Sequence, residues 1–264
     1  MPDAAYWMRV RAVLRVHSVL LLALVLPWAV FAIVAKSIWQ TGGFVGDRTI
    51  LKLLHRHSSP VLDNLATTLT DIGDTGPMVA VGCLIAIGLL WRRHYREALV
   101  FALSVGGAMG LTQVLKALFA RPRPELWLSI KPAQHYSFPS GHAMDTAALA
   151  AAISFLLWQY RAHWLGWTVG PLFALSVGWA RMYLGVHYPS DVVAGLASSV
   201  GWVTGIHVLF SPIFAPQRRR WHQALHQQLP SVVSPPKQPP AATTETLSQT
   251  GARTERPKAW QRKS

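Results

Sequence analysis

The sequence predicts an all-α integral membrane protein with six transmembrane helices, an interfacial amphipathic helical segment and a disordered C-terminal tail. The first observation is composition: 51% of the 264 residues are hydrophobic and 14% are charged, against roughly 25% charged residues in globular domains. The second is a series of apolar windows that approach the roughly 20 residues needed to span a hydrocarbon core. The third is a stretch from about residue 215 onward that is too polar to build a core.

The first apolar window covers about residues 18–35 and contains Pro27, where we expect a kink. Three arginines precede it, as in the basic n-region of a cleaved signal peptide. The apolar stretch is long, however, and no small-x-small cleavage site precedes Lys36. We therefore favour a retained membrane anchor that follows a cytoplasmic N-terminus at residues 1–17.

Five further windows complete the predicted membrane domain, which extends over residues 18–210. They cover about residues 76–91, 97–118, 142–158, 164–183 and 191–210. The single cysteine, Cys83, lies inside the second window, so the chain has no internal disulfide.

The orientation follows from the basic residues, because Lys and Arg accumulate in short cytoplasmic loops. With six spans, four basic segments fall on one side of the membrane: Arg9–Arg15, Arg92–Arg96, Arg161 and Arg218–Arg220. Both termini are therefore predicted to be cytoplasmic, and the loops at 37–75, 119–141 and 181–190 face outward. We expect the inner membrane of a bacterium.

Two polar segments flank or interrupt these windows. In the segment at about 40–72, apolar residues recur at helical spacing with charged residues between them. One or two interfacial helices are expected there, and a soluble cap on the bundle is equally compatible.

The tail at 215–264 carries nine Lys or Arg and two Glu, half of the net charge of +14. We expect its Arg218–Arg220 cluster to meet anionic lipid headgroups.

Polar residues gather at the predicted outer face, around the ends of the third to sixth windows. They are Lys116, Arg121, Arg123, Ser140, Gly141, His142, Arg181, His187 and Asp191. Each has an ordinary structural explanation, because cations at helix ends reach toward headgroups and Ser or Asp commonly begin helices.

Taken together, these residues predict a phosphate-binding site. The positive-inside bias predicts few cations on this face, yet Lys116, Arg123 and Arg181 gather there with one nearby carboxylate. The helix that begins near His142 offers free backbone N–H groups, and Gly141 allows an oxyanion to approach the main chain. No carboxylate cluster that could hold Mg²⁺ accompanies them, so we expect no metal or other cofactor.

The two histidines and the aspartate predict chemistry at that phosphate. His187 and Asp191 are four residues apart, so a short turn can bring the carboxylate to one ring nitrogen and leave the other as a nucleophile. His142 could then protonate the leaving oxygen and afterwards activate water.

The pattern resembles the type-2 phosphatidic acid phosphatase superfamily, whose signature is K-x6-R-P, then P-S-G-H, then S-R-x5-H-x3-D. Lys116 and Arg123-Pro124 match the first block, and Pro139 to His142 match the second. Arg181, His187 and Asp191 match the third at the required spacings, but Ala180 stands where the signature has serine.

The resemblance implies that His187 forms a phosphohistidine, that Asp191 orients it and that His142 is the acid. It also implies that Lys116, Arg123, Ser140, Gly141 and Arg181 hold the phosphate without a metal. We expect the missing hydroxyl at Ala180 to have a modest effect on rate, since a neutral hydrogen bond contributes about 0.5–1.5 kcal/mol. Arg121 lies outside the signature and is interpreted as a headgroup or substrate contact, or equally as a surface cation.

The sequence therefore predicts a membrane lipid phosphatase whose site is at the outer face. Undecaprenyl diphosphate, phosphatidylglycerol phosphate and phosphatidic acid are candidate substrates, and the motifs do not choose among them. A lipid phosphotransferase would use the same residues. A non-enzymatic lipid-binding protein is the alternative from another class, although the catalytic set is complete. A nucleic-acid partner, suggested only by net charge, conflicts with the apolar spans, and nothing indicates an oligomeric state.

Overall fold

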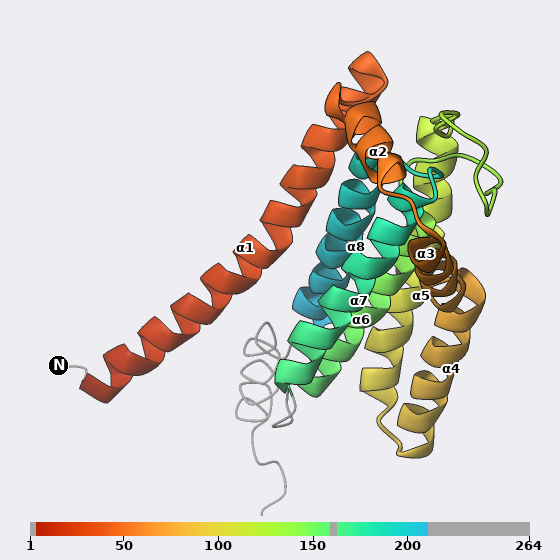
Figure 1. Ribbon diagram of the computed structural model, residues 1–264. Coiled ribbons are helices and arrows are strands. Elements are labelled where there is room, and N and C mark those ends of the chain that lie inside the picture. Colours follow the sequence, from red (N-terminus) through yellow and green to blue (C-terminus); the bar gives the residue numbers. More distant parts are fainter. Residues whose placement is uncertain (1–3, 159–162, 211–264) are drawn as a thin grey trace, which may run out of the picture. The chain divides into compact units, whose positions relative to one another are not determined.

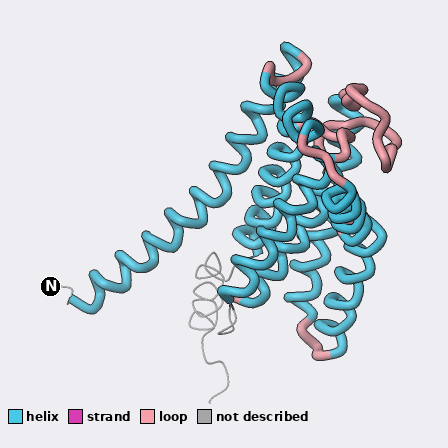
Figure 2. Tube along the Cα trace, viewed as in Figure 1, coloured by secondary structure: helices cyan, strands magenta, loops and turns pink. Residues whose placement is uncertain are grey.

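The computed structural model describes residues 4–158 and 163–210, and within these ranges it contains helices and loops but no strand (Figure 2). The helices shown in Figure 1 are α1 (Ala4–Thr41), α2 (Gly46–Arg56), α3 (Pro60–Ile72), α4 (Thr75–Trp91), α5 (Tyr95–Phe119), α6 (Gly141–Leu157), α7 (His163–Tyr183) and α8 (Pro189–Phe210). Each of the six apolar windows coincides, to within one residue, with part of α1 or of α4 to α8. The all-helical expectation is confirmed for the described residues.

Three helices of the described part are long and apolar enough to cross a membrane: Leu22–Thr41 within α1, α5 and α8. A fourth span results if α3 and α4, which meet at a bend of 45°, are counted as one. α6 is apolar but has only 17 residues. The count of six spans therefore stays a prediction.

The last three turns of α1 pack on α8 and on the loop that leads into α6. Val34, Ala35 and Ile38 are buried with Phe138 and Ala194 in one apolar cluster, and α1 continues as one helix through Pro27. This cluster holds the chain in place just before α6 begins.

α2 and α3 occupy most of the segment predicted to be amphipathic, so two helices form there. Pro60 stands in the first turn of α3, where its missing N–H costs nothing. Ser59 caps the same helix by accepting a hydrogen bond from Leu62 N at 3.4 Å. α3 packs on α7 through Ala66, which is buried in one cluster with Ala180 and Tyr183. Whether these helices lie in a membrane interface stays a prediction.

α6 lies at the centre of the bundle, in contact with α5, α7 and α8. Its buried face consists largely of small residues, four of them alanine, which allow neighbouring helices to approach closely. Ser154 Oγ donates to Gly166 O at 2.6 Å and so joins α6 to α7. The first turn of α6 is consequently surrounded by the ends of other helices.

The connections α1–α2 and α5–α6 lie at one end of the bundle, and the turn at 92–94 lies at the opposite end (Figure 2). This matches the sides on which the sequence placed these segments. The basic tail at 215–264, with Arg218–Arg220, and Arg161, which the sequence predicts to be cytoplasmic, lie outside the described residues.

Candidate active site

Four segments meet at one place: the end of α5, the 120–140 loop, the start of α6 and the first turn of α8. Ser140 N donates to Asp191 O at 3.1 Å, which joins that start directly to the first turn of α8. A β-carbon placed on Gly141 would lie 3.3 Å from Lys116 Nζ, so the lysine of α5 lies against this glycine. The structure thus brings the three signature blocks into one site.

His187 is buried between an acidic and a basic neighbour. Its Nδ1 lies 3.5 Å from Asp191 Oδ2, and its Nε2 lies 3.1 Å from Arg123 Nη1. Burial lowers the pKa of His187 well below its usual value, and the charges of Arg181, Arg123 and Lys116 lower it further. The ring is therefore neutral at physiological pH and keeps a nitrogen lone pair for nucleophilic attack.

The Asp191 carboxylate is fixed by contacts on both of its oxygens. Oδ2 accepts a hydrogen bond from Tyr188 N at 2.9 Å, and Oδ1 accepts one from Arg121 Nη1 at 2.5 Å. Asp191 is fully buried. The turn between His187 and α8 therefore presents Oδ2 to the histidine ring in a defined orientation.

Several side-chain atoms of the site have no hydrogen-bond partner among the described residues. Buried polar atoms are nearly always hydrogen-bonded. In the described ranges, five buried side-chain N or O atoms are not, and two of these, Ser140 Oγ and Arg181 Nε, are donors at the site. A third, His187 Nδ1, faces Asp191 Oδ2 at 3.5 Å. The side chains of Lys116 and Arg181 also form no ion pair with any described residue. Such a group of donors suits an oxyanion that would accept from several of them.

The Arg123 guanidinium is held mainly by backbone carbonyls. It donates to Gln134 O at 2.7 Å, to His135 O at 2.9 Å and to Val186 O at 2.8 Å. Burial lowers its pKa from the ordinary value, and the Asp191 carboxylate opposes that shift. The guanidinium therefore joins the loop before α6 to the turn that carries His187 through hydrogen bonds to both.

His142 has an acidic partner that the sequence did not suggest. Its Nε2 lies 3.4 Å from Oδ1 of Asp74, which caps α4. The next residue, Thr75, donates to Asp145 Oδ2 of α6 at 2.7 Å. The start of α4 is thus attached to the first turn of α6 at two points.

Arg121 is buried, so the surface cation, one of the two interpretations drawn from the sequence, is wrong. Its side chain is 6% exposed and contacts Asp47 Oδ2 at 3.0 Å as well as Asp191. Asp47 stands in the first turn of α2, 74 residues before its partner, so no local pattern revealed the pair. A lone acidic residue at a helix start is commonly explained by the helix dipole.

Ala180, the departure from the signature, faces away from the polar atoms of the site. Its methyl group is buried in an apolar cluster with Ala66 of α3 and with Leu184 and Val186. Packing between α3 and α7 therefore accounts for a small apolar residue here.

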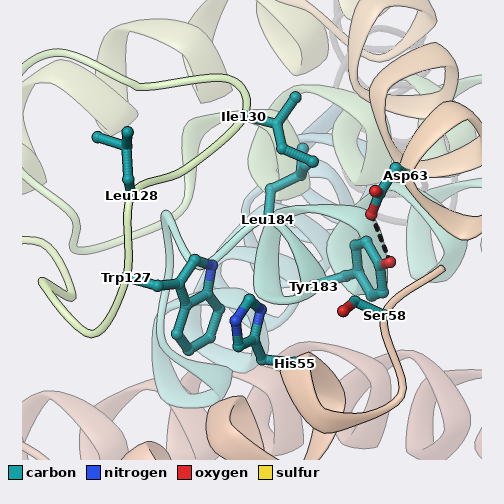
Figure 3. Close-up of a pocket in the computed structure, with 8 residues that line it drawn as sticks. All are labelled: His55, Ser58, Asp63, Trp127, Leu128, Ile130, Tyr183 and Leu184. Carbon is teal, nitrogen blue, oxygen red and sulfur yellow. Dashed lines mark hydrogen bonds between the residues drawn. The ribbon is translucent and has the colours of Figure 1, made fainter. Parts of the chain in front are cut away.

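A separate hollow of about 90 Å³ lies beside the site, between α2, α3 and the 120–140 loop (Figure 3). The rings of His55 and Trp127 stack along one wall with centroids 4.1 Å apart. Tyr183 Oη donates to Asp63 Oδ1 at 2.6 Å on another. Trp127 also packs on Gly185, where φ is +68° and a β-carbon would collide with the indole. Trp127 thus connects the wall of this hollow to the turn that carries His187, but none of the predicted catalytic residues lines the hollow.

Comparison with known proteins matches residues 97–214 to the model of the PAP2 superfamily. The chain is 31% identical to the undecaprenyl-diphosphatase BcrC of Bacillus subtilis over 57% of its length and 77% of that protein. It is 27% identical to phosphatidylglycerophosphatase B of the same organism, over 63% of this chain and 84% of the relative. This chain belongs to the PAP2 superfamily.

The PAP2 assignment extends to the fold. The crystal structure of a transmembrane PAP2-type phosphatidylglycerolphosphate phosphatase from Bacillus subtilis superposes with a TM-score of 0.65 at 25% identity. The match covers 71% of this chain and 96% of that one. The family resemblance drawn from the three blocks is therefore confirmed, as is the expectation of a PAP2 membrane phosphatase.

Proposed function

We propose that this PAP2 protein hydrolyses a phosphate or diphosphate monoester of a membrane lipid through a phosphohistidine intermediate. The observation that carries the proposal is a neutral, buried His187 next to Lys116, Ser140 and Arg181. The side chains of these three residues have no hydrogen-bond or ion-pair partner in the described part of the chain.

In the first step, Nε2 of His187 forms a bond to phosphorus while the bond from phosphorus to the departing oxygen breaks. His142 gives its proton to that oxygen, and Asp191 keeps the ring oriented through Nδ1. In the second step, His142 takes a proton from water as the water oxygen bonds to phosphorus. The bond to Nε2 then breaks, and inorganic phosphate leaves.

The donors around the phosphate lower the barrier of both steps. Lys116, Arg181 and the Ser140 hydroxyl supply positive charge and hydrogen bonds to the equatorial oxygens, and Gly141 leaves room at the start of α6. Arg123 can share an N–H between Nε2 and an incoming oxygen. These cations occupy the role that metal ions have in other phosphoryl transfers, so activity in a chelator is expected.

The substrates proposed are undecaprenyl diphosphate, phosphatidylglycerol phosphate and phosphatidic acid, the first two of which correspond to the names of relatives. The site would face outward from the inner membrane, since the basic segments of the sequence favour cytoplasmic termini. Both prenyl and diacyl tails would reach it sideways from the bilayer.

The test is phosphate release by the purified protein in detergent with EDTA, with the three lipids offered in parallel and His187→Ala as control. Release by the wild type alone, with acid-labile label on the wild-type protein after a rapid quench, is expected. Equal release by His187→Ala would overturn the proposal. Labelling of the protein without release, relieved by a second lipid alcohol, would instead indicate a phosphotransferase.

A further inference from the structure

Resting on the proposed function, we propose that Asp47 of α2 and Arg121 are positioning residues for the nucleophile. They would act through Asp191, which makes α2 a structural part of the active site. Neither residue belongs to the signature blocks. The proposal starts from a continuous chain of buried polar contacts that ends at the His187 ring.

Arg121 contacts two carboxylates at once. Nη1 lies 2.5 Å from Asp191 Oδ1 and 2.8 Å from Ser190 Oγ, while Nη2 lies 3.0 Å from Asp47 Oδ2. The guanidinium carbon also lies 4.1 Å from the centre of the Tyr188 ring. Tyr188 precedes α8 and Ser190 lies in its first turn, so Arg121 contacts the segment that connects His187 to Asp191.

Asp47 holds the same segment from the other side. Its Oδ1 accepts a hydrogen bond from Ser190 N at 3.1 Å, and its Oδ2 accepts one from Ser190 Oγ at 2.5 Å. The aspartate is 4% exposed, and Leu51 anchors the next turn of α2 in the core. The backbone before α2 lies close to Arg121. At Gly43, where φ is +137°, a β-carbon would collide with the Arg121 guanidinium.

The charge arrangement explains why both residues are needed. One guanidinium lies between two buried carboxylates, and removal of a partner from a buried ion pair leaves an uncompensated charge. Arg121 occupies Oδ1 of Asp191, so only Oδ2 is left to face His187 Nδ1. Without that restraint the carboxylate can rotate, and the ring loses its fixed tautomer and direction.

Asp47 contacts no atom of the proposed phosphate-binding group, so its effect should appear in turnover and not in substrate binding. The test compares Asp47→Asn with wild type, using phosphatidylglycerol phosphate in detergent micelles with EDTA. We expect kcat to fall about tenfold while KM changes less than about twofold, since the interaction is used in the transition state. Asp71→Asn is the matched control, because Asp71 is an exposed carboxylate of α3 paired with Lys131.

A double-mutant cycle tests whether Asp47 acts on turnover through Asp191. Asp47→Asn is combined with Asp191→Ala, and turnover is followed over hours using labelled lipid. Asp47→Asn should add less than about a twofold loss in that background, because coupled residues are non-additive. A full tenfold additional loss would overturn the inference. If turnover of Asp191→Ala is undetectable, a second experiment tests whether added guanidinium restores the kcat of Arg121→Ala. Restoration of kcat supports the inference, and failure to restore it overturns the inference.

The two proposals fail differently. Wild-type kcat in Asp47→Asn beside an inactive His187→Ala would overturn this inference and leave the phosphohistidine mechanism intact. Wild-type activity in His187→Ala would overturn the mechanism itself. Thermal unfolding of each variant in the same detergent separates positioning from unfolding, since a positioning effect persists at temperatures where the variant is folded.

Discussion

Arg123 Nη1 and His187 Nε2 lie 3.1 Å apart, so the guanidinium faces the ring nitrogen that is turned away from Asp191. The same arginine holds three carbonyls of the loop before α6. One planar group therefore contacts both the proposed nucleophile and the loop proposed to bind phosphate, so its geometry should matter as much as its charge.

Arg123→Lys should keep the positive charge but lose the fork of hydrogen bonds to the loop. We expect kcat/KM to fall about 100-fold, because a single ammonium cannot replace several directed donors. Phosphate release from the preferred lipid is the measurement. Arg48→Lys, at an exposed position of α2, is the control, and an equally small effect of both changes would contradict the role of geometry.

Gly141→Ala should weaken substrate binding without unfolding the protein. The new methyl group would lie 3.3 Å from Lys116 Nζ, so the flexible lysine can shift by a few tenths of an ångström. We expect KM to rise severalfold and Tm to stay within about 2 °C of wild type. Gly106→Ala in α5, where a β-carbon meets nothing within 4 Å, should change neither value.

Asp74→Asn tests the partner of the proposed acid. His142 is needed most when the leaving oxygen is strongly basic, so the variant should lose about tenfold in kcat with a lipid phosphate. With an aryl phosphate that has an acidic leaving group, the loss should be below about threefold. An identical loss with both substrates would show that Asp74 does not act on proton transfer.

The buried His187 predicts a pH dependence of stability. Its pKa in the folded protein lies well below its usual value, while the unfolded chain takes up a proton near pH 6.5. The unfolded state then binds more protons, so this residue reduces stability as the pH falls below about 6.5. Between pH 7.5 and 5, the Tm of wild type should decrease more than that of His187→Gln. His57 is exposed, so the Tm of His57→Gln should decrease as much as that of wild type.

Ala180→Ser restores the residue of the signature and should change kcat less than about threefold. The side chain lies in an apolar cluster with Ala66 and Leu184, where a hydroxyl finds no site atom to contact. A large gain in rate would mean that the hydroxyl reaches the phosphate after a rearrangement of α7.

Much of this arrangement was predictable because its signals are local. The apolar windows predict helices such as α5 and α8, and the four residues from His187 to Asp191 are few enough for one short turn to bring the two side chains together. The partners Asp47 and Asp74 could not be predicted, because each reaches the site through tertiary contact and looks locally like an ordinary helix-start residue. The sequence left two interpretations of Arg121 open for the same reason, since only the position of α2 decides whether it is buried.

The contact between Asp47 and Ser190 joins residues 143 positions apart. During synthesis, the aspartate leaves the ribosome long before the helix that supplies its partner. A membrane-inserted chain that stops at α7 therefore holds a carboxylate with no Ser190 to bind, and the docking of α8 completes its contacts last. The contacts of Asp47 with Ser190 can therefore form only after α8 has been synthesised.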